Sequence, residues 1–418
     1  MTDTVQTHCC IAGGGPAGMM LGFLLARLGV DVHVLEKHVD FLRDFRGDTI
    51  HPSTLEVMYE LDILQQFLQR PHQEVQQLAG QIGNDELILA DFSHLPTHCC
   101  FIAFMPQWEF LNFLAEQAAR YAAFHLQMEW EVTELIEEKG QVAGVRAQTP
   151  RGMVEIRAGL TIGADGRHSV VRERAALEVE NLGAPMDVLW MRLSRKPSDP
   201  GQTFGRINTG RILALLDRDD YWQLAFVIPK GTAAELRAKG LPAIRQEIAA
   251  LVPFLRDRVD ELQDWERQIK LLTVVVDRLR RWYRPGLLCI GDAAHAMSPI
   301  GGVGINLAIQ DAVATANILG PKLQQGTPTE ADLRAVQQRR EFPTRATQRL
   351  QVLVQNNVIR RILNSDRPLS LPRSLTPLRS WPWLRRIPAR FIGLGFRPEH
   401  IKTVSSSSGA RGRSAIEP

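Results

Sequence analysis

The chain has 418 residues, of which 44% are hydrophobic and 23% charged, as in a soluble globular protein of two or three domains. Its 49 Lys and Arg against 46 Asp and Glu leave a net charge of +3, too small an excess to indicate nucleic-acid binding. Five cysteines, including the pairs Cys9-Cys10 and Cys99-Cys100, form neither a disulfide nor a zinc pattern and predict a cytoplasmic protein. Neither a signal peptide nor an uncharged apolar run long enough to span a membrane is evident.

The first forty residues predict a strand, a helix and a second strand. Residues 8–13 (HCCIAG) read as a buried strand that ends in glycine, and residues 16–29 are apolar around most of a helical circumference. Residues 31–36 (DVHVLE) then read as a second strand. This order within about thirty residues is typical of a βαβ unit.

A glycine pattern lies between the first strand and the helix. Gly13, Gly15 and Gly18 fit G-x-G-x-x-G, in which the glycines permit a tight turn, close approach of a pyrophosphate, and helix–strand packing. Glu36, at the end of the second strand, is placed to accept hydrogen bonds from a ribose. The pattern predicts a dinucleotide site, for NAD or FAD, at residues Gly13, Gly15, Pro16, Ala17, Gly18, Glu36 and Lys37.

The remaining chain predicts further elements. Residues 108–121 have helical apolar spacing, and residues 141–147 and 153–164 read as strands. Short β-rich runs follow from about 181 to 280, interrupted by a helix-prone stretch at 232–265. A strand at 286–292 (GLLCIGD) and a helix from about 302 then resume the pattern of the first part.

These elements predict a division of the chain. Residues 1–180 and 281–345 would form one discontinuous dinucleotide-binding domain. Residues 181–280, with part of 76–104, would form an inserted β-sheet domain that binds substrate. Residues 346–402 would form a C-terminal helical segment, and residues 403–418 a disordered tail.

Two further motifs distinguish FAD from NAD. They are ADGRHSVVR at 164–172 and GDAAHAMSPIGGVGINLAIQDA at 291–312. With the first glycine pattern, they resemble the class A FAD-dependent aromatic hydroxylases, the flavoprotein monooxygenases typified by p-hydroxybenzoate hydroxylase. The resemblance spans about residues 7–340. It implies an α/β fold, with a Rossmann-like FAD-binding domain of that type and the inserted sheet domain, and it implies non-covalent FAD.

The resemblance also implies roles for individual residues. Asp292 would bind the ribityl hydroxyls of FAD, Arg46 and Gln107 would contact the ribityl chain and phosphates, and Asp165 would serve both FAD and NAD(P)H. His295 reads as structural rather than catalytic. The loop that faces the flavin and the reacting oxygen would consist of Pro299, Gly301, Gly302, Gly304, Ile305 and Asn306.

The activity that the resemblance implies is hydroxylation of an electron-rich aromatic substrate. NADH or NADPH would reduce FAD, and O2 would react through a C4a-hydroperoxyflavin, with no metal in the site. The inserted sheet is expected to border the substrate, and the candidates are Trp190, Arg192, Tyr221, Trp222, Gln223 and Phe226. On the strand 221–227, alternation places Tyr221 and Trp222 on opposite faces, and the sequence does not tell which face is inward. Tyr221 is the candidate for helping to deprotonate a phenol.

Three alternatives belong beside this interpretation. A flavin-dependent halogenase is disfavoured because Leu224 and Phe226 stand where that class has tryptophans. A reductase or dehydrogenase of the same fold, acting on a lipophilic substrate without oxygen transfer, is a second alternative. A non-catalytic flavin-binding accessory protein is the third.

Residues 373–397 combine six arginines with Trp381, Trp383, Phe391 and Phe396. Such a segment either rests on an anionic membrane surface or packs over the body of the protein, and we favour packing. We expect a monomer or a homodimer.

Overall fold

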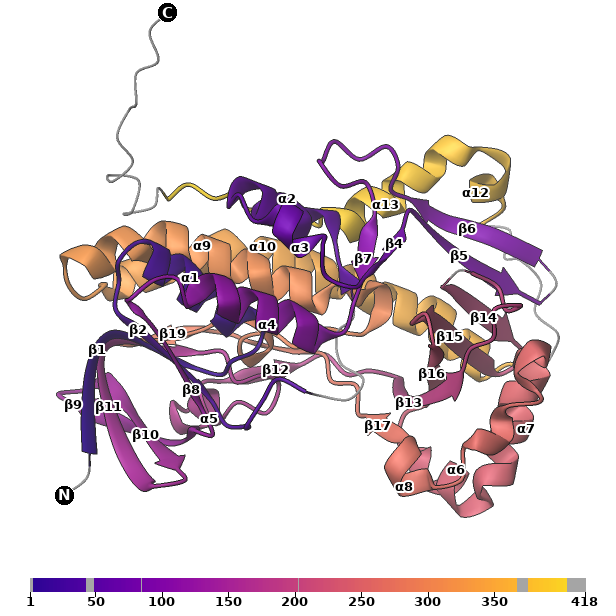
Figure 1. The fold of residues 1–418 in the computed structure, drawn as a ribbon, viewed down its shortest axis with the longest axis horizontal. Coiled ribbons are helices and arrows are strands. Elements are labelled where there is room, and N and C mark those ends of the chain that lie inside the picture. Colours follow the sequence, from indigo (N-terminus) through magenta and orange to yellow (C-terminus); the bar gives the residue numbers. More distant parts are fainter. Residues whose placement is uncertain (1–2, 43–48, 84, 202, 367–374, 404–418) are drawn as a thin grey trace, which may run out of the picture.

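The computed structural model describes residues 3–42, 49–83, 85–201, 203–366 and 375–403. Its first layer is an eight-stranded sheet in which β20, β11, β1, β2 and β8 run parallel, with the β9–β10 hairpin and β19 added antiparallel (Figure 1). Every residue of β2 is buried, as expected for a parallel strand covered on both faces. The strands are β1 (Asp3–Ala12), β2 (Val32–Glu36), β8 (Phe124–Met128), β9 (Glu131–Glu138), β10 (Gln141–Thr149), β11 (Gly152–Gly163), β19 (Tyr283–Arg284) and β20 (Leu287–Cys289).

Helices cover the upper face of this sheet in Figure 1. Helix α1 packs against α4 and α9, and α9 packs against α10. Because α1 is enclosed on all sides, ten of its twelve residues are buried, which explains its apolar circumference. These helices are α1 (Pro16–Arg27), α4 (Gln107–Ala118), α9 (Gly304–Gln325) and α10 (Glu330–Val354). The short helix α5 (Val170–Arg174) packs against β9 instead.

The second layer is a seven-stranded sheet in the order β17-β13-β16-β15-β14-β5-β6. Most of its strands come from the β-rich middle of the chain, and β5 and β6 join them from residues 77–91. The strands are β5 (Gln77–Ile82), β6 (Asp85–Asp91), β13 (Met186–Ser194), β14 (Phe204–Asn208), β15 (Arg211–Asp217), β16 (Tyr221–Pro229) and β17 (Lys270–Leu272).

One face of this second sheet is sealed by the helix-prone stretch. Trp222, Leu224 and Phe226 of β16 form a core with Ile244 and Ile248 of α7. The alternate side chains of β16 therefore point away from these helices, toward the first layer. The covering elements are α6 (Ala233–Lys239), α7 (Leu241–Leu251), η1 (Pro253–Leu255), η2 (Val259–Glu261) and α8 (Trp265–Gln268).

Small elements connect the two layers. β3, β7 and β4 form a three-stranded sheet, and β12 pairs with β18. The C-terminal elements run back along β6 (Figure 1). These elements are β3 (Thr49–Ile50), α2 (Pro52–Glu60), α3 (Leu64–Phe67), β4 (Gln73–Val75), β7 (Ile102–Phe104), β12 (Val179–Asn181), β18 (Asp277–Leu279), η3 (Gly291–Ala293), η4 (Ile300–Gly302), η5 (Gln355–Ile359, a π-helical turn), α11 (Arg360–Leu363), α12 (Thr376–Ser380), η6 (Pro382–Arg385) and α13 (Arg386–Gly393).

The elements predicted from sequence agree with the structure within a few residues. The predicted helix at 108–121 is α4, and the predicted strand at 153–164 is β11. The structure has two large sheets that form two layers, and the division of the chain into domains stays a prediction.

A buried carboxylate joins the first sheet to its helices. Asp311 of α9 is fully buried and accepts hydrogen bonds from the Gly291 N–H at 3.1 Å and from Arg340 Nε of α10 at 2.9 Å. Its other partner is Nε2 of His295, at 2.6 Å. Burial alone would raise the pKa of Asp311, but His295 and Arg340 lower it, so the carboxylate remains charged. This arrangement confirms the structural interpretation of His295.

Replacing Arg340 with Met should destabilise the protein by about 3–5 kcal/mol, because the buried Asp311 would lose its cationic partner. Arg345→Met is the matched control, since the side chain of Arg345 is 44% exposed and pairs at 3.0 Å with Glu341, which is 39% exposed. That control should cost about 1 kcal/mol or less. Thermal and urea unfolding of the three proteins would test this, and equal losses in both variants would contradict it.

Candidate active site

The glycine turn at the start of α1 has the geometry that the sequence predicts. Gly13 has a φ of +110°, and a Cβ there would lie 2.4 Å from the carbonyl oxygen of Ala164. A Cβ on Gly18 would lie 2.0 Å from the carbonyl oxygen of Gly13. By contrast, nothing lies within 4 Å of a Cβ built on Gly15. The turn is therefore tightly packed on the protein side and open at the N-terminus of α1, where free N–H groups favour an anion.

Glu36 ends β2 beside this turn. Its carboxylate accepts hydrogen bonds from the N–H groups of Gly14 and His38, each at 3.1 Å. These contacts hold the carboxylate at the wall of the cavity described below. Lys37 lines the same wall, with its ammonium group 3.9 Å from Glu131.

Two further acidic residues are part of the same cavity wall. Asp165 follows β11, and its Oδ2 accepts a hydrogen bond from the Val171 N–H at 3.1 Å. Burial raises the pKa of Asp165, and its Oδ1 is buried without a hydrogen-bond partner among the described residues. Asp292, in η3, is about one-third exposed and lies 3.9 Å from Arg167. Both carboxylates line the cavity.

The loop from Pro299 to Gly304 closes one side of the cavity. Gly301 and Gly302 have φ values of +78° and +63°, which side chains other than hydrogen rarely allow. Gly302 is also fixed by its surroundings, because Thr49 Oγ1 donates to its carbonyl oxygen at 2.9 Å. Helix α9 begins directly after this loop, at Gly304.

Asn306 has a different role from the one expected. Its side chain accepts from the His51 N–H and the Thr54 hydroxyl and donates to the Thr49 carbonyl. It is 5% exposed and absent from the cavity wall. The expected side-chain contact with flavin is therefore not what the structure shows: the amide braces α9 against β3 and α2, because the protein already satisfies its polar atoms.

Helix α10 supports the same loop through a residue that the sequence did not single out. Gln351 donates from Nε2 to the carbonyl oxygens of Ser298 and Ile300, both at 3.0 Å, and accepts from the Ser298 N–H. Gln351 is buried. No pattern marked it, since a glutamine among other polar helix residues carries no local signal.

One continuous cavity of about 870 Å³ joins the glycine turn to the second sheet. Ala225 and Val227 of β16 line it, with Val188 and Trp190 of β13. The structure thus decides the question left open by the sequence: the odd-numbered face of residues 221–227 is turned inward. The predicted residues on the wall are Gly13, Gly15, Pro16, Ala17, Glu36, Lys37, Gln107, Asp165, Asp292, Pro299, Gly301, Gly302, Gly304 and Ile305.

Tyr221 shares the inward face but not this cavity. It lies at the end of β16 and lines a separate hollow of about 480 Å³, with the Arg192 guanidinium 4.9 Å from its ring centre. The expectation that Tyr221 contacts substrate in the main cavity is not supported, because the strand carries it past the cavity edge. Arg46 lies outside the described residues.

The cysteines do not belong to this chemistry. Cys9, Cys10 and Cys289 are fully buried on β1 and β20. Burial raises the pKa of the Cys10 thiol to about 12, so it is protonated and unreactive at neutral pH.

Among the described residues, no helix is both long and apolar enough to cross a membrane.

Comparison with known proteins agrees with this geometry. The family model described as "FAD binding domain" matches residues 6–350. The chain is 33% identical over 352 residues to 6-methylpretetramide 4-monooxygenase of Streptomyces rimosus, covering 84% of each chain. It is 23% identical to para-nitrophenol 4-monooxygenase of a Pseudomonas species, covering 79% of this chain and 82% of that one.

A crystal structure of a probable FAD-dependent monooxygenase, PqsL from Pseudomonas aeruginosa, has the same fold. It aligns with a TM-score of 0.72 and 22% identity over 86% of this chain and 97% of that one. The chain belongs to the FAD-binding family of flavoprotein monooxygenases, the class A FAD-dependent aromatic hydroxylases.

Proposed function

We propose that this FAD-dependent monooxygenase hydroxylates a large, uncharged aromatic substrate, with NADH or NADPH as electron donor. The observation that carries the proposal is the single cavity, whose polar end lies at the glycine turn and whose apolar end lies under the second sheet. The named monooxygenase relatives favour this function over a reductase or an accessory protein. The five unpaired cysteines support a cytoplasmic location.

The residues at the polar end suit FAD. The open N-terminus of α1 beyond Gly15 would receive the pyrophosphate, and Glu36 would accept from the adenosine ribose. Asp292, which is partly exposed on the wall, would accept from the ribityl hydroxyls, and the unpartnered Oδ1 of Asp165 offers a further acceptor. Bound FAD supplies transfer of electrons from the nicotinamide to O2.

The loop between the two ends would orient the reaction. The N–H groups at the start of α9, near Gly304, present the positive end of a 22-residue helix to the cavity. They would stabilise negative charge that develops on the flavin ring. Gln351 and Thr49 hold this loop in place through direct hydrogen bonds. The apolar walls would exclude water from the reacting atoms.

The apolar end indicates the class of substrate. Strand register places Trp190, Ala225, Ala214 and Gly205 side by side across four strands. The three small residues form a flat shelf beside the indole. Among the described residues, those that the second sheet contributes to the cavity wall are all uncharged. Such a surface suits a flat, fused-ring substrate better than a small benzoate, whose carboxylate would need a cationic partner.

The proposed function would be tested by NADH and NADPH oxidation assays with two substrates: 6-methylpretetramide, as a fused-ring phenol, and p-hydroxybenzoate. We expect slow oxidation alone, acceleration by the fused-ring compound, and one atom of labelled O2 in the product. Anaerobic stopped-flow reduction would measure the same acceleration directly. Fast reduction without substrate, or an unlabelled product, would favour the reductase alternative.

Replacing Asp292 with Asn should weaken FAD retention, because the ribityl hydroxyls would lose a charged acceptor. Such a bond contributes about 1.5–3 kcal/mol, so we expect a rise of tenfold or more in the Kd for FAD. The measurement is flavin fluorescence during titration of the apoprotein. Asp220→Asn, at an exposed turn outside the cavity, is the control, and equal affinity in both variants would overturn the assignment.

Replacing Ala214 with Phe should block the shelf without disturbing the polar end. We expect wild-type FAD content but at least a tenfold loss of substrate-stimulated NAD(P)H oxidation. Ala250→Phe places the same bulk on the exposed surface of α7 and should behave as wild type. Unchanged stimulation in Ala214→Phe would show that substrate does not occupy the shelf.

The outer face of η6 and α13 supports a peripheral membrane contact. Trp383, Ile387 and Phe391 recur every four residues and are 59%, 50% and 39% exposed, while Ala389 and Gly393 are buried on the opposite side. A Cβ on Gly393 would lie 2.8 Å from Leu95, so the helix lies close to the body. The inner face of this helix therefore packs on the protein, while its outer face is exposed.

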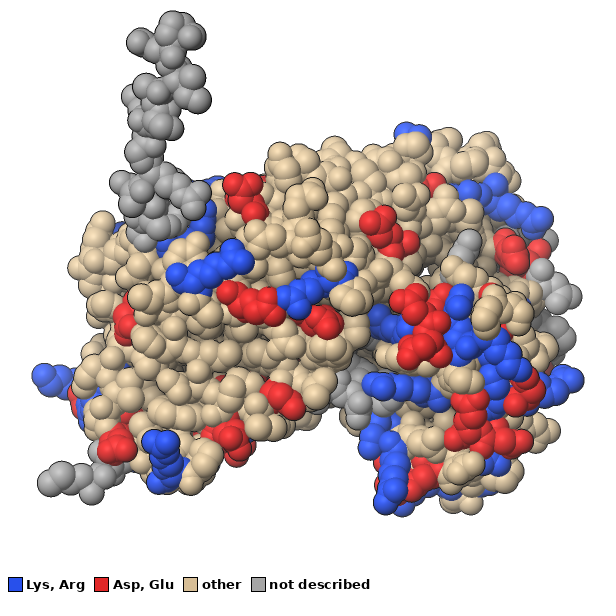
Figure 2. All heavy atoms as spheres, viewed as in Figure 1, with Lys and Arg blue, Asp and Glu red and all other residues tan. Residues whose placement is uncertain are grey.

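The positive charge of this segment favours an anionic partner for its outer face. Residues 375–397 contain five arginines and no acidic residue, and the surface over α12 and α13 in Figure 2 is largely uncharged with basic side chains at its edge. Leu89 of β6, against which α13 packs, is both exposed and on the cavity wall. We therefore propose that this face rests on an anionic bilayer near the entrance for a lipophilic substrate.

This contact predicts co-sedimentation with vesicles of phosphatidylcholine and phosphatidylglycerol but not of phosphatidylcholine alone. Binding should weaken in salt and be lost in Arg386→Glu/Arg390→Glu. The control is Arg237→Glu/Arg267→Glu, which reverses two exposed charges on α6 and α8. Binding that ignores lipid charge, or an equal loss in both variants, would contradict the proposal.

A further inference from the structure

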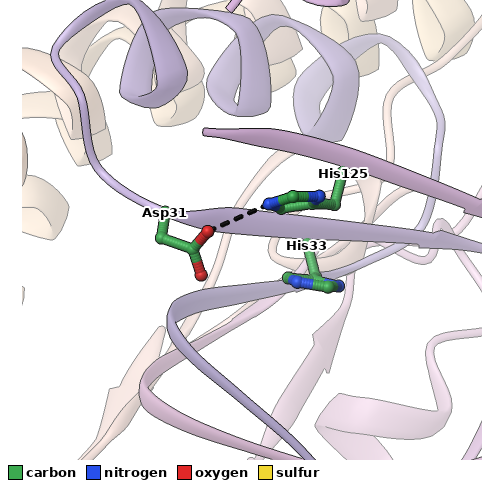
Figure 3. Close-up of side chains that lie close together, drawn as sticks. All are labelled: Asp31, His33 and His125. Carbon is green, nitrogen blue, oxygen red and sulfur yellow. Dashed lines mark hydrogen bonds and ion pairs between the residues drawn. The ribbon is translucent and has the colours of Figure 1, made fainter. Parts of the chain in front are cut away.

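Two strands of the first sheet bring together three side chains that can bind a metal ion, although one of them is far from the other two in sequence. Asp31 directly precedes β2, His33 lies on β2, and His125 lies on β8. Parallel register pairs His33 with His125, and Asp31 is two residues before His33, so it has the same side of the strand. Figure 3 shows the carboxylate beside the two imidazole rings.

The ligand atoms are close enough to share an ion. One oxygen of Asp31 lies 3.0 Å from Nε2 of His125, and one ligand atom from each of the three residues lies within 4.8 Å of the others. The imidazole rings stack with centres 4.4 Å apart. Tetrahedral coordination at 2.0–2.1 Å separates ligand atoms by about 3.3 Å, so small side-chain rotations would complete the geometry.

Burial and backbone contacts favour a defined site. His33 is 9% exposed, and its Nδ1 is buried with no hydrogen-bond partner among the described residues, which is costly for a polar atom. The Asp31 carbonyl is fixed by hydrogen bonds from the Thr7 hydroxyl and the Cys9 N–H. The side chains of Asp31 and His125 are 35% and 38% exposed, so an ion could enter from solvent.

We propose that Asp31, His33 and His125 form a binding site for a divalent transition metal such as Zn²⁺, with water as a fourth ligand. Two imidazole nitrogens and one carboxylate are a donor set that suits Zn²⁺, Ni²⁺ and Cu²⁺. No metal was predicted from the sequence, because these three residues form no His/Cys cluster along the chain.

The position of the site indicates a structural role. It lies at the amino end of β2, whereas Glu36, at the carboxyl end of the same strand, lines the cavity. Glu36 follows His33 by three positions along the strand, a distance of about 10 Å. Strand β8 is at the edge of the sheet and pairs only with β2 on the sheet's main path. A bound ion would join this edge strand to its neighbour and leave the flavin site unchanged.

The test is calorimetric titration of Zn²⁺ into untagged, chelator-treated holoenzyme, with thermal unfolding measured in parallel. We expect one ion per chain and a higher Tm with Zn²⁺. Asp31→Asn and His125→Gln should each weaken binding at least tenfold and abolish the Tm rise. FAD content and NAD(P)H oxidation should be the same with and without Zn²⁺.

The matched control is His98→Gln. His98 also pairs with a carboxylate, Glu56 at 3.0 Å, and also stacks on a ring, that of Tyr59, but the described part of the chain offers no third ligand there. Zn²⁺ binding should be unchanged in this variant. The proposal would be overturned if wild type bound no ion, or if His98→Gln lost binding as fully as His125→Gln. Circular dichroism and the metal-free Tm of each variant separate loss of the site from loss of the fold.

Discussion

The site depends on the hydrogen bonds and ion pairs that the buried carboxylate of Asp311 forms. A charge without solvent must be fully paired, and here the partners come from three places: the Gly291 turn, His295, and Arg340 on α10. Satisfying one carboxylate therefore fixes the turn that carries Asp292 relative to two long helices. Because the buried carboxylate needs all of these partners, Asp311 fixes the position of one wall of the cavity.

The polar and apolar ends of the cavity are built from different chemical groups. At the polar end, backbone amides and carboxylates are held by hydrogen bonds, such as those from the Gly14 and His38 N–H groups to Glu36, so that they meet a charged cofactor without rearranging. At the apolar end, small side chains such as Ala214 and Ala225 leave space of a defined shape but form no directional hydrogen bonds. The second end can thus vary in specificity while the first keeps the cofactor in place.

The local part of the site could be predicted from sequence. The contact of Gly18 with Gly13 and the hydrogen bond from Gly14 to Glu36 lie within one βαβ unit, where the pattern indicated. Gln107 and Asp292 also line the cavity as expected. The surroundings of Tyr221 and Asn306 could not be predicted, because the extent of a cavity along a strand, and the partners that occupy an amide, depend on segments distant in sequence.

From the sequence alone, periodicity and turn chemistry, which act over a few residues, determined the order of elements and a dinucleotide site. The resemblance of three motifs to the class A hydroxylases determined the fold class and the cofactor. Only the tertiary structure decided which face of β16 is inward, because the answer depends on helices α6–α8 covering the other face. It alone brought Gln351 to the loop at Ser298, and His125 to His33 across 92 positions of sequence. Contacts of this kind follow from sheet register and packing, which side-chain identity at a single position does not encode.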